Sequence, residues 1–172
     1  MQIRKRLRIS FGYFQMIYED VFEFANKLHS NNSLIGLDLG TKTIGVAVSD
    51  TILSVATPIK TIKRKKFSTD ADQLLEIISI KNCCGVVVGL PKNMDGSEGP
   101  RAQSTRAFAR NFSAKTQLPI TFWDERLSTV AAEKALLEAD TTRKRRAEVI
   151  DHVAAAYILQ GFLDRLEILD NC

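Results

Sequence analysis

The nearly continuous apolar run Gly85–Leu90 constrains the fold more than any other feature of the sequence. A run of valines of this length is typical of a strand that is covered on both faces. Such a strand lies inside a sheet with helices on either side, so the run predicts an α/β domain. The chain has 172 residues, 45% of them hydrophobic, which is enough to bury a core for one such domain without disulfides.

The segments around this run predict the rest of the sheet. Leu34–Leu39 and Ile44–Ser49 read as a hairpin, and Ala56–Ile62 as a third strand with Pro58 at a sheet edge, where its missing N–H does no harm. The order predicts a mixed five-stranded sheet with helices on both faces. The other expected elements are helices over Thr69–Ile80, Pro100 to about Lys115, Ser128–Ala139 and Ala147–Leu166, and a strand over Ile120–Trp123.

Residues 1–32 are expected to form an N-terminal extension, and residues 33–172 the domain itself. Polar residues interrupt the apolar part of the extension, which is unlike a secretory signal, and Asp20–Leu28 has helical spacing. A start of translation at Met16 is an open alternative. No stretch approaches the roughly 20 apolar residues of a membrane span, and the adjacent Cys83 and Cys84 suggest buried free thiols. We therefore expect a cytoplasmic protein without a membrane partner.

Carboxylates occur where the expected strands end. Asp38 lies in an otherwise apolar strand, where an unpaired charge would carry a large desolvation cost. Asp124 and Glu125 follow the strand Ile120–Trp123, at the end that borders the functional crevice of open α/β sheets. Being consecutive, the two point in different directions, so we expect only one to face a site.

Asp151 lies at the border of the apolar stripe of the last expected helix. The small residues Ala154 and Ala155 share its side of that helix, so the helix can approach the sheet closely there. Taken singly, each carboxylate also fits an ordinary role, such as a strand-end hydrogen bond or a solvated helix face. Together they form an oxygen-rich set without a Cys or His cluster, which suits Mg²⁺ or Mn²⁺ and the hydrolysis of phosphodiesters.

Four motifs lie along the chain in the order Leu37–Asp50, Val88–Ser97, Asp124–Thr129 and Asp151–Ala155. They resemble those of the YqgF family, also called RuvX-like pre-16S ribosomal RNA nucleases or Holliday junction resolvases. The resemblance covers about residues 33–166. It implies an RNase H-like fold and an enzyme that processes the 5′ end of pre-16S rRNA.

The resemblance also implies the site residues. Asp38, Glu125 and Asp151 would form the catalytic acidic triad and bind Mg²⁺ or Mn²⁺, with Asp38 shared between two ions and Asp124 as a further candidate ligand. The basic segment before Asp151 has no glycine, unlike that of many family members. Side chains expected to bind nucleic acid are Lys42, Lys92, Asn93, Arg101, Arg126, Lys144, Arg145 and Arg146.

The net charge of +4 permits a polyanionic partner. We expect structured RNA or branched DNA, bound by a monomer or a homodimer. Three alternatives remain open at this point. The first is a resolvase of four-way DNA junctions, which needs two sites and hence a dimer. The second is a non-catalytic module that binds nucleic acid. The third is an ATP-binding protein, because the segment after Asp38 also resembles a phosphate loop of the actin and sugar-kinase superfamily.

Overall fold

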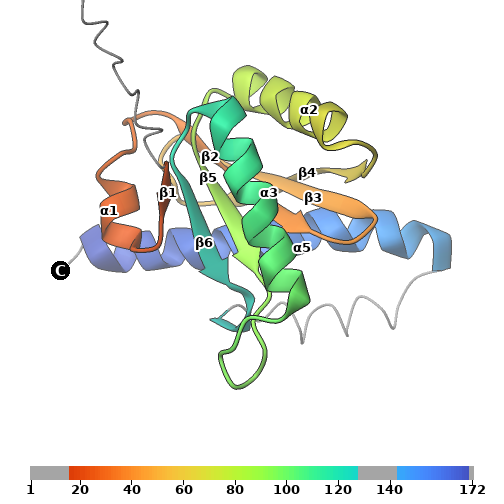
Figure 1. Cartoon of the computed structure of the whole chain (residues 1–172). Coiled ribbons are helices and arrows are strands. Elements are labelled where there is room, and N and C mark those ends of the chain that lie inside the picture. Colours follow the sequence, from red (N-terminus) through yellow and green to blue (C-terminus); the bar gives the residue numbers. More distant parts are fainter. Residues whose placement is uncertain (1–15, 128–142, 171–172) are drawn as a thin grey trace, which may run out of the picture.

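The structure, a computed structural model, describes residues 16–127 and 143–170. In these ranges a single sheet has the strand order β1-β6-β5-β2-β3-β4 (Figure 1). The strands are β1 (Ile17–Tyr18), β2 (Ser33–Leu39), β3 (Thr43–Ser49), β4 (Ala56–Lys63), β5 (Cys83–Leu90) and β6 (Ile120–Asp124). The helices are α1 (Val21–Ala25), α2 (Phe67–Ile80), α3 (Pro100–Thr116), a short 3₁₀ turn η1 (Glu125–Leu127) and α5 (Arg143–Asp170).

The sheet is mixed, as predicted from the order of the elements. β2, β3 and β4 form an antiparallel meander, whereas β2, β5, β6 and β1 run parallel to one another. The five expected strands are confirmed, and Pro58 lies in the edge strand β4. The sixth strand, β1, was not predicted, because two residues are too short to show a periodicity. The expected helix over 128–139 lies outside the described residues.

Alternating side chains divide the core between the two faces of the sheet. On one face, odd-numbered residues of β2 such as Ile35 and Leu37 pack beneath α2 and α3. On the other face, α5 runs across β3, β2 and β5, with α1 beside its C-terminal half (Figure 1). This second face is lined by the small residues Gly36, Gly45 and Gly89, so α5 lies close to the strands.

The described part of the N-terminal segment packs into the domain. β1 pairs with β6, and the Thr121 hydroxyl donates to the carbonyl of Tyr18 at 2.9 Å. Phe24 of α1 is fully buried, with its ring edge-on to that of Phe162 of α5 at 5.5 Å between centroids. Residues 17–25 therefore add an edge strand to the sheet, and Phe24 adds a core side chain to its α5 face.

Two further expectations concern the thiols and the membrane. Cys83 and Cys84 are buried and free, and burial raises the pKa of the Cys83 thiol to about 12. That thiol is therefore protonated at neutral pH and inert. Across 16–127 and 143–170, no helix combines the length and apolar character needed to cross a bilayer.

Phe24 and Phe22 of α1 make a matched pair that tests this packing. Phe24→Ala should lower the free energy of unfolding by about 3–5 kcal/mol, because a fully buried ring is lost. Phe22 is 62% exposed, and Phe22→Ala should change it by about 0.5 kcal/mol or less. Urea unfolding followed by circular dichroism measures both. Equal losses would contradict the placement of α1 against α5.

Candidate active site

β2 places Asp38 on the face of the sheet that α5 covers. Gly36, two residues earlier, shares this face, since a Cβ built on it would lie 2.7 Å from the Cβ of Leu159 in α5. Asp38 itself is only 5% exposed. A carboxylate buried this deeply is tolerated as an anion only with hydrogen bonds or positive charge around it.

Gly45 of β3 brings Asp151 of α5 to Asp38. Gly45 is the cross-strand partner of Asp38. A Cβ built on Gly45 would lie 1.9 Å from the carbonyl oxygen of Asp151, so the helix backbone rests directly on the strand backbone. No side chain fits between them, and the crossing therefore sets Asp151 beside Asp38.

Gly89 of β5 has the same relation to Glu125. β5 lies on the other side of β2, and the register pairs Leu37 with Val88, so Gly89 adjoins Asp38. A Cβ on Gly89 would lie 2.9 Å from Oε1 of Glu125. The Glu125 carboxylate thus lies over β5 on the α5 face. The backbone of Asp151 and the side chain of Glu125 thus lie against the two strands that flank Asp38.

Thr43 fixes the orientation of Asp151. Its hydroxyl donates to Oδ2 of Asp151 at 2.6 Å, across 108 positions of the chain. Thr43 begins β3, directly after the turn that follows Asp38. This contact ties the helix carboxylate to the same hairpin that carries Asp38, and it holds one of the two carboxylate oxygens in place.

Asp124 is engaged elsewhere. Its neighbour Trp123 packs under α5, so Asp124 points away from that face of the sheet. Its carboxylate accepts from the Arg126 guanidinium at 2.7 Å and from the Arg126 backbone N–H at 3.0 Å. These contacts hold the pKa of Asp124 below its usual range. Of the two consecutive acids, Glu125 is the one that faces Asp38.

A groove of about 770 Å³ opens beside Asp151, with basic residues in its walls. Lys42 from the β2–β3 turn, Lys63 from the end of β4 and Arg101 from the start of α3 line it together with Asp151. Lys42 and Arg101 were expected to bind nucleic acid. Lys63 was not singled out from the sequence, and only the pairing of β3 with β4 brings it next to the turn.

The other expected nucleic-acid-binding residues are placed differently. Lys92 lies where its charge lowers the pKa values of Asp124 and Glu98. Asn93 closes its own loop by donating to the Ser97 hydroxyl at 2.9 Å. Arg126 is bound to Asp124. The side chains of Lys144, Arg145 and Arg146 lie outside the described residues.

Sequence reasoning also missed two residues that position the acids. Gly45 has a visible signal, because a glycine inside a strand often marks the close approach of another backbone. Thr43 has none, since a hydroxyl at a turn is ordinary and its partner is far away in the chain. His152, next to Asp151, is partly buried, with its Nδ1 3.1 Å from the Thr61 hydroxyl.

The three acids are of the chemical type that binds a divalent cation. Carboxylate oxygens from Asp38, Glu125 and Asp151 are the ligands that Mg²⁺ and Mn²⁺ prefer. In the parts of the chain that the structure describes, no three acidic, His or Cys side chains are already grouped as ligands of one ion. Joint binding of one ion would therefore require these side chains to rearrange.

A family model described as "RuvX: Holliday junction resolvase" matches residues 32–165, a range that includes all three carboxylates. The chain belongs to the RuvX family. This confirms the family that the four motifs indicate.

Similar proteins support the assignment to RuvX. A relative from Ruegeria pomeroyi is 71% identical over 154 residues, covering 90% of this chain and 100% of the relative. One from Roseobacter denitrificans is 69% identical over 156 residues, covering 90% of this chain and 96% of the relative. Both are named as a pre-16S rRNA nuclease.

Among solved structures, Thermus thermophilus RuvC in complex with a Holliday junction substrate matches with a TM-score of 0.51 at 13% identity. The match covers 79% of this chain and 96% of that one. At this identity the likeness concerns the fold, and it confirms the RNase H-like fold implied by the sequence motifs.

Gly45→Ala tests the crossing of α5 over β3. The added methyl would overlap the Asp151 carbonyl, so α5 must move away from β3, and the free energy of unfolding should fall by at least about 2 kcal/mol. Gly99→Ala is the matched control, because its Cβ would meet atoms no nearer than 3.5 Å. Urea unfolding of both variants is the measurement. A Gly45→Ala protein as stable as the control would contradict the backbone contact.

Proposed function

We propose that this RuvX protein is a Mg²⁺-dependent nuclease that processes the 5′ end of pre-16S rRNA. The observation that carries the proposal is that Asp151 and Glu125 lie against the two strands that flank Asp38, where α5 crosses the sheet. Asp38 is buried, and a carboxylate in this position costs stability unless it serves chemistry. Metal-assisted hydrolysis of a phosphodiester is the reaction class that uses only such oxygen donors.

Asp38, Glu125 and Asp151 would hold the ion. Mg²⁺ or Mn²⁺ bound there would activate a water and stabilise the leaving oxygen of the cleaved bond. Asp38, between the strands that support the other two acids, would contact every bound ion. Thr43 would keep Asp151 oriented through its 2.6 Å hydrogen bond.

Lys42, Lys63 and Arg101 would bind the phosphates on one side of the acids, along the groove that they line. Cations at this place favour the approach of a polyanionic strand, which the carboxylates alone would repel. Lys144, Arg145 and Arg146, which precede Asp151 in the sequence, stay predicted contacts of the nucleic acid. The charge pattern therefore supports a nucleic acid as the partner.

Pre-16S rRNA is the substrate that we favour, because the relatives named for it are about 70% identical over almost their whole length. Processing one RNA strand requires only a monomer, and in bacteria such a substrate places the protein in the cytoplasm. The family description favours a second candidate, a four-way DNA junction. Two symmetric cuts in a junction would require a homodimer that presents two sites.

Asp38→Asn should abolish cleavage, because one ligand oxygen of the proposed site becomes an uncharged amide. The loss should exceed about 100-fold, since changes to partners of metal ligands alone cost 10–100-fold. Asp72→Asn, an exposed acid on α2, is the control and should cleave like the natural protein. Circular dichroism melting would confirm that both variants are folded.

The assay uses a precursor RNA containing the 5′ side of 16S rRNA and a synthetic four-way DNA junction, each with and without Mg²⁺. Cleavage of the RNA alone supports the favoured substrate, and cleavage of the junction alone supports the second candidate. Full activity in Asp38→Asn, or cleavage that persists without divalent ions, would refute the proposed mechanism. Binding without cleavage of either substrate would favour a non-catalytic module.

A further inference from the structure

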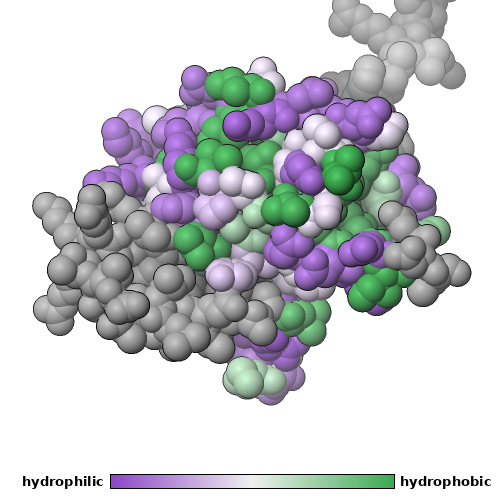
Figure 2. Space-filling view, turned by 180° about the vertical axis from the view of Figure 1, so that it is seen from behind, coloured by the Kyte–Doolittle hydropathy of each residue, from purple (hydrophilic) through white to green (hydrophobic). Residues whose placement is uncertain are grey.

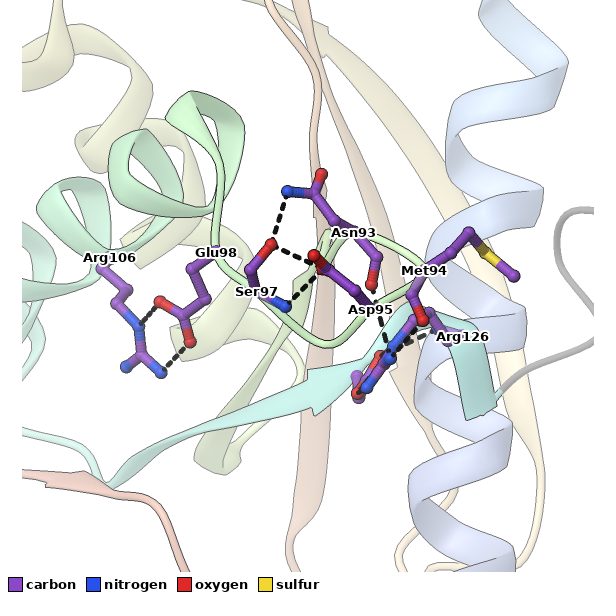
Figure 3. A network of polar contacts seen from close by, with 8 residues as sticks. Asn93, Met94, Asp95, Ser97, Glu98, Arg106 and Arg126 are labelled. Atoms are coloured by element: carbon purple, nitrogen blue, oxygen red, sulfur yellow. Dashed lines mark hydrogen bonds and ion pairs between the residues drawn. The ribbon is translucent and has the colours of Figure 1, made fainter.

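The loop Pro91–Gly99 between β5 and α3 projects beyond the end of the sheet and is closed by its own hydrogen bonds (Figures 1 and 3). The backbone N–H of Asn93 donates to the Ser97 carbonyl at 2.9 Å, and that of Gly96 to the Asn93 carbonyl at 2.9 Å. Asp95 accepts from both the Ser97 hydroxyl, at 2.6 Å, and the Ser97 backbone N–H, at 2.9 Å. These hydrogen bonds hold the loop in a defined turn.

Arg126 fastens this loop to the candidate active site. It directly follows Glu125, and its guanidinium donates to the carbonyls of Asn93 and Met94 at 3.3 and 3.4 Å. The same guanidinium is also paired with Asp124 at 2.7 Å. The main chain of Met94 is thus bonded to the residue next to Glu125, which fixes the loop relative to the three acids.

The arginines around the loop are neutralised. Arg126 is paired with Asp124, and Arg106 with Glu98 at 2.6 Å and Glu19 at 2.6 Å. These pairings raise the pKa values of both guanidinium groups. The arginines are therefore committed to holding the loop, in contrast to the basic groove on the other side of Asp151.

Met94 is 91% exposed. Hydrophobic residues are interspersed with hydrophilic ones over the surface, so exposure by itself does not distinguish Met94 (Figure 2). What distinguishes Met94 is that its main-chain carbonyl accepts a hydrogen bond from Arg126, the residue after Glu125. Leu127, two residues after Glu125, is also exposed. The loop after β5 and the turn after β6 therefore each carry an exposed apolar side chain.

We propose that Met94 packs against an unstacked base of the RNA beside the cleaved bond. The inference rests on the proposed nuclease function and adds the group that orients the substrate. Apolar side chains, methionine among them, insert between bases in other nucleic-acid complexes. Unpaired bases of structured RNA offer a flat apolar face for such a contact, and the thioether is polarisable enough to suit it. Phosphates in the basic groove and a base on Met94 would hold the strand from two sides of the acids.

Base unstacking can be measured without cleavage. The protein carries Asp38→Asn, and the probe is the precursor RNA with 2-aminopurine placed in turn at successive positions around the mature 5′ end. The fluorescence of 2-aminopurine rises when the base leaves its stack. We expect a rise of several-fold at one or two adjacent positions, lost on adding Met94→Ala and restored by Met94→Leu.

Three matched changes complete the test. Ile80→Ala removes another exposed apolar side chain, at the end of α2, and should leave the signal unchanged. Lys42→Ala and Arg101→Ala should weaken binding and flatten its salt dependence while keeping the signal at saturating protein. Met94→Ala should weaken RNA binding about fivefold without changing the salt dependence.

The outcomes separate this inference from the nuclease proposal. A fluorescence rise that survives Met94→Ala, or no rise at any position, overturns the role of Met94 even where the natural protein cleaves the RNA. A rise that depends on Met94 upholds that role even where the natural protein fails to cleave. An RNA that the natural protein does not bind refutes both.

Discussion

The direct contact between the backbones of α5 and β3 at Gly45 is the constraint on which the candidate site depends. A sheet normally keeps a helix at the distance set by its side chains. Here a Cβ on Gly45 would come within 1.9 Å of the Asp151 carbonyl, and a Cβ on Gly36 within 2.7 Å of the Leu159 Cβ. The missing side chains let the helix approach. Asp151 of α5 is thereby brought against β3, the strand whose Gly45 pairs with Asp38.

Charge is divided between the two sides of this contact. On the side of the β2–β3 turn, Lys42, Lys63 and Arg101 line an open groove that reaches Asp151. On the side of the loop Pro91–Gly99, Arg126 forms an ion pair with Asp124, and Arg106 forms one with Glu98 of the loop. Arg101 and Arg106 are close in the sequence but have different roles, because Arg101 lines the groove whereas Arg106 is paired with Glu98. The groove favours phosphates, whereas the loop offers an apolar side chain.

Much of the fold follows from local patterns in the sequence. The run Gly85–Leu90 and the hairpin around Gly40–Thr43 are predictable because burial on a sheet imposes a strict order of residue types. The strand β1 is not, since its formation depends on pairing with β6, about 100 positions later. For the same reason the burial of Phe24 under α5 could not be foreseen from its own segment.

A residue of the candidate site can be predicted from the sequence where its polarity differs from that of the segment around it. Asp38 stands out in an apolar strand, and Glu125 and Asp151 follow from strand ends and small helix neighbours. That Glu125 and not Asp124 faces Asp38 depends on the alternation at Trp123 and on the Arg126 ion pair. Thr43 and Lys63 give no such signal, because long-range strand and helix packing alone creates their roles.

The most direct test of the central claim is a crystal structure of the natural protein with Mn²⁺, read by anomalous diffraction from the ion. We predict an anomalous peak next to Gly45 and Gly89, coordinated by carboxylate oxygens of Asp38, Glu125 and Asp151. Loss of that peak in Asp38→Asn crystals would show that the ion depends on this carboxylate. A peak elsewhere on the surface, with these three carboxylates free of metal at saturating Mn²⁺, would contradict the claim.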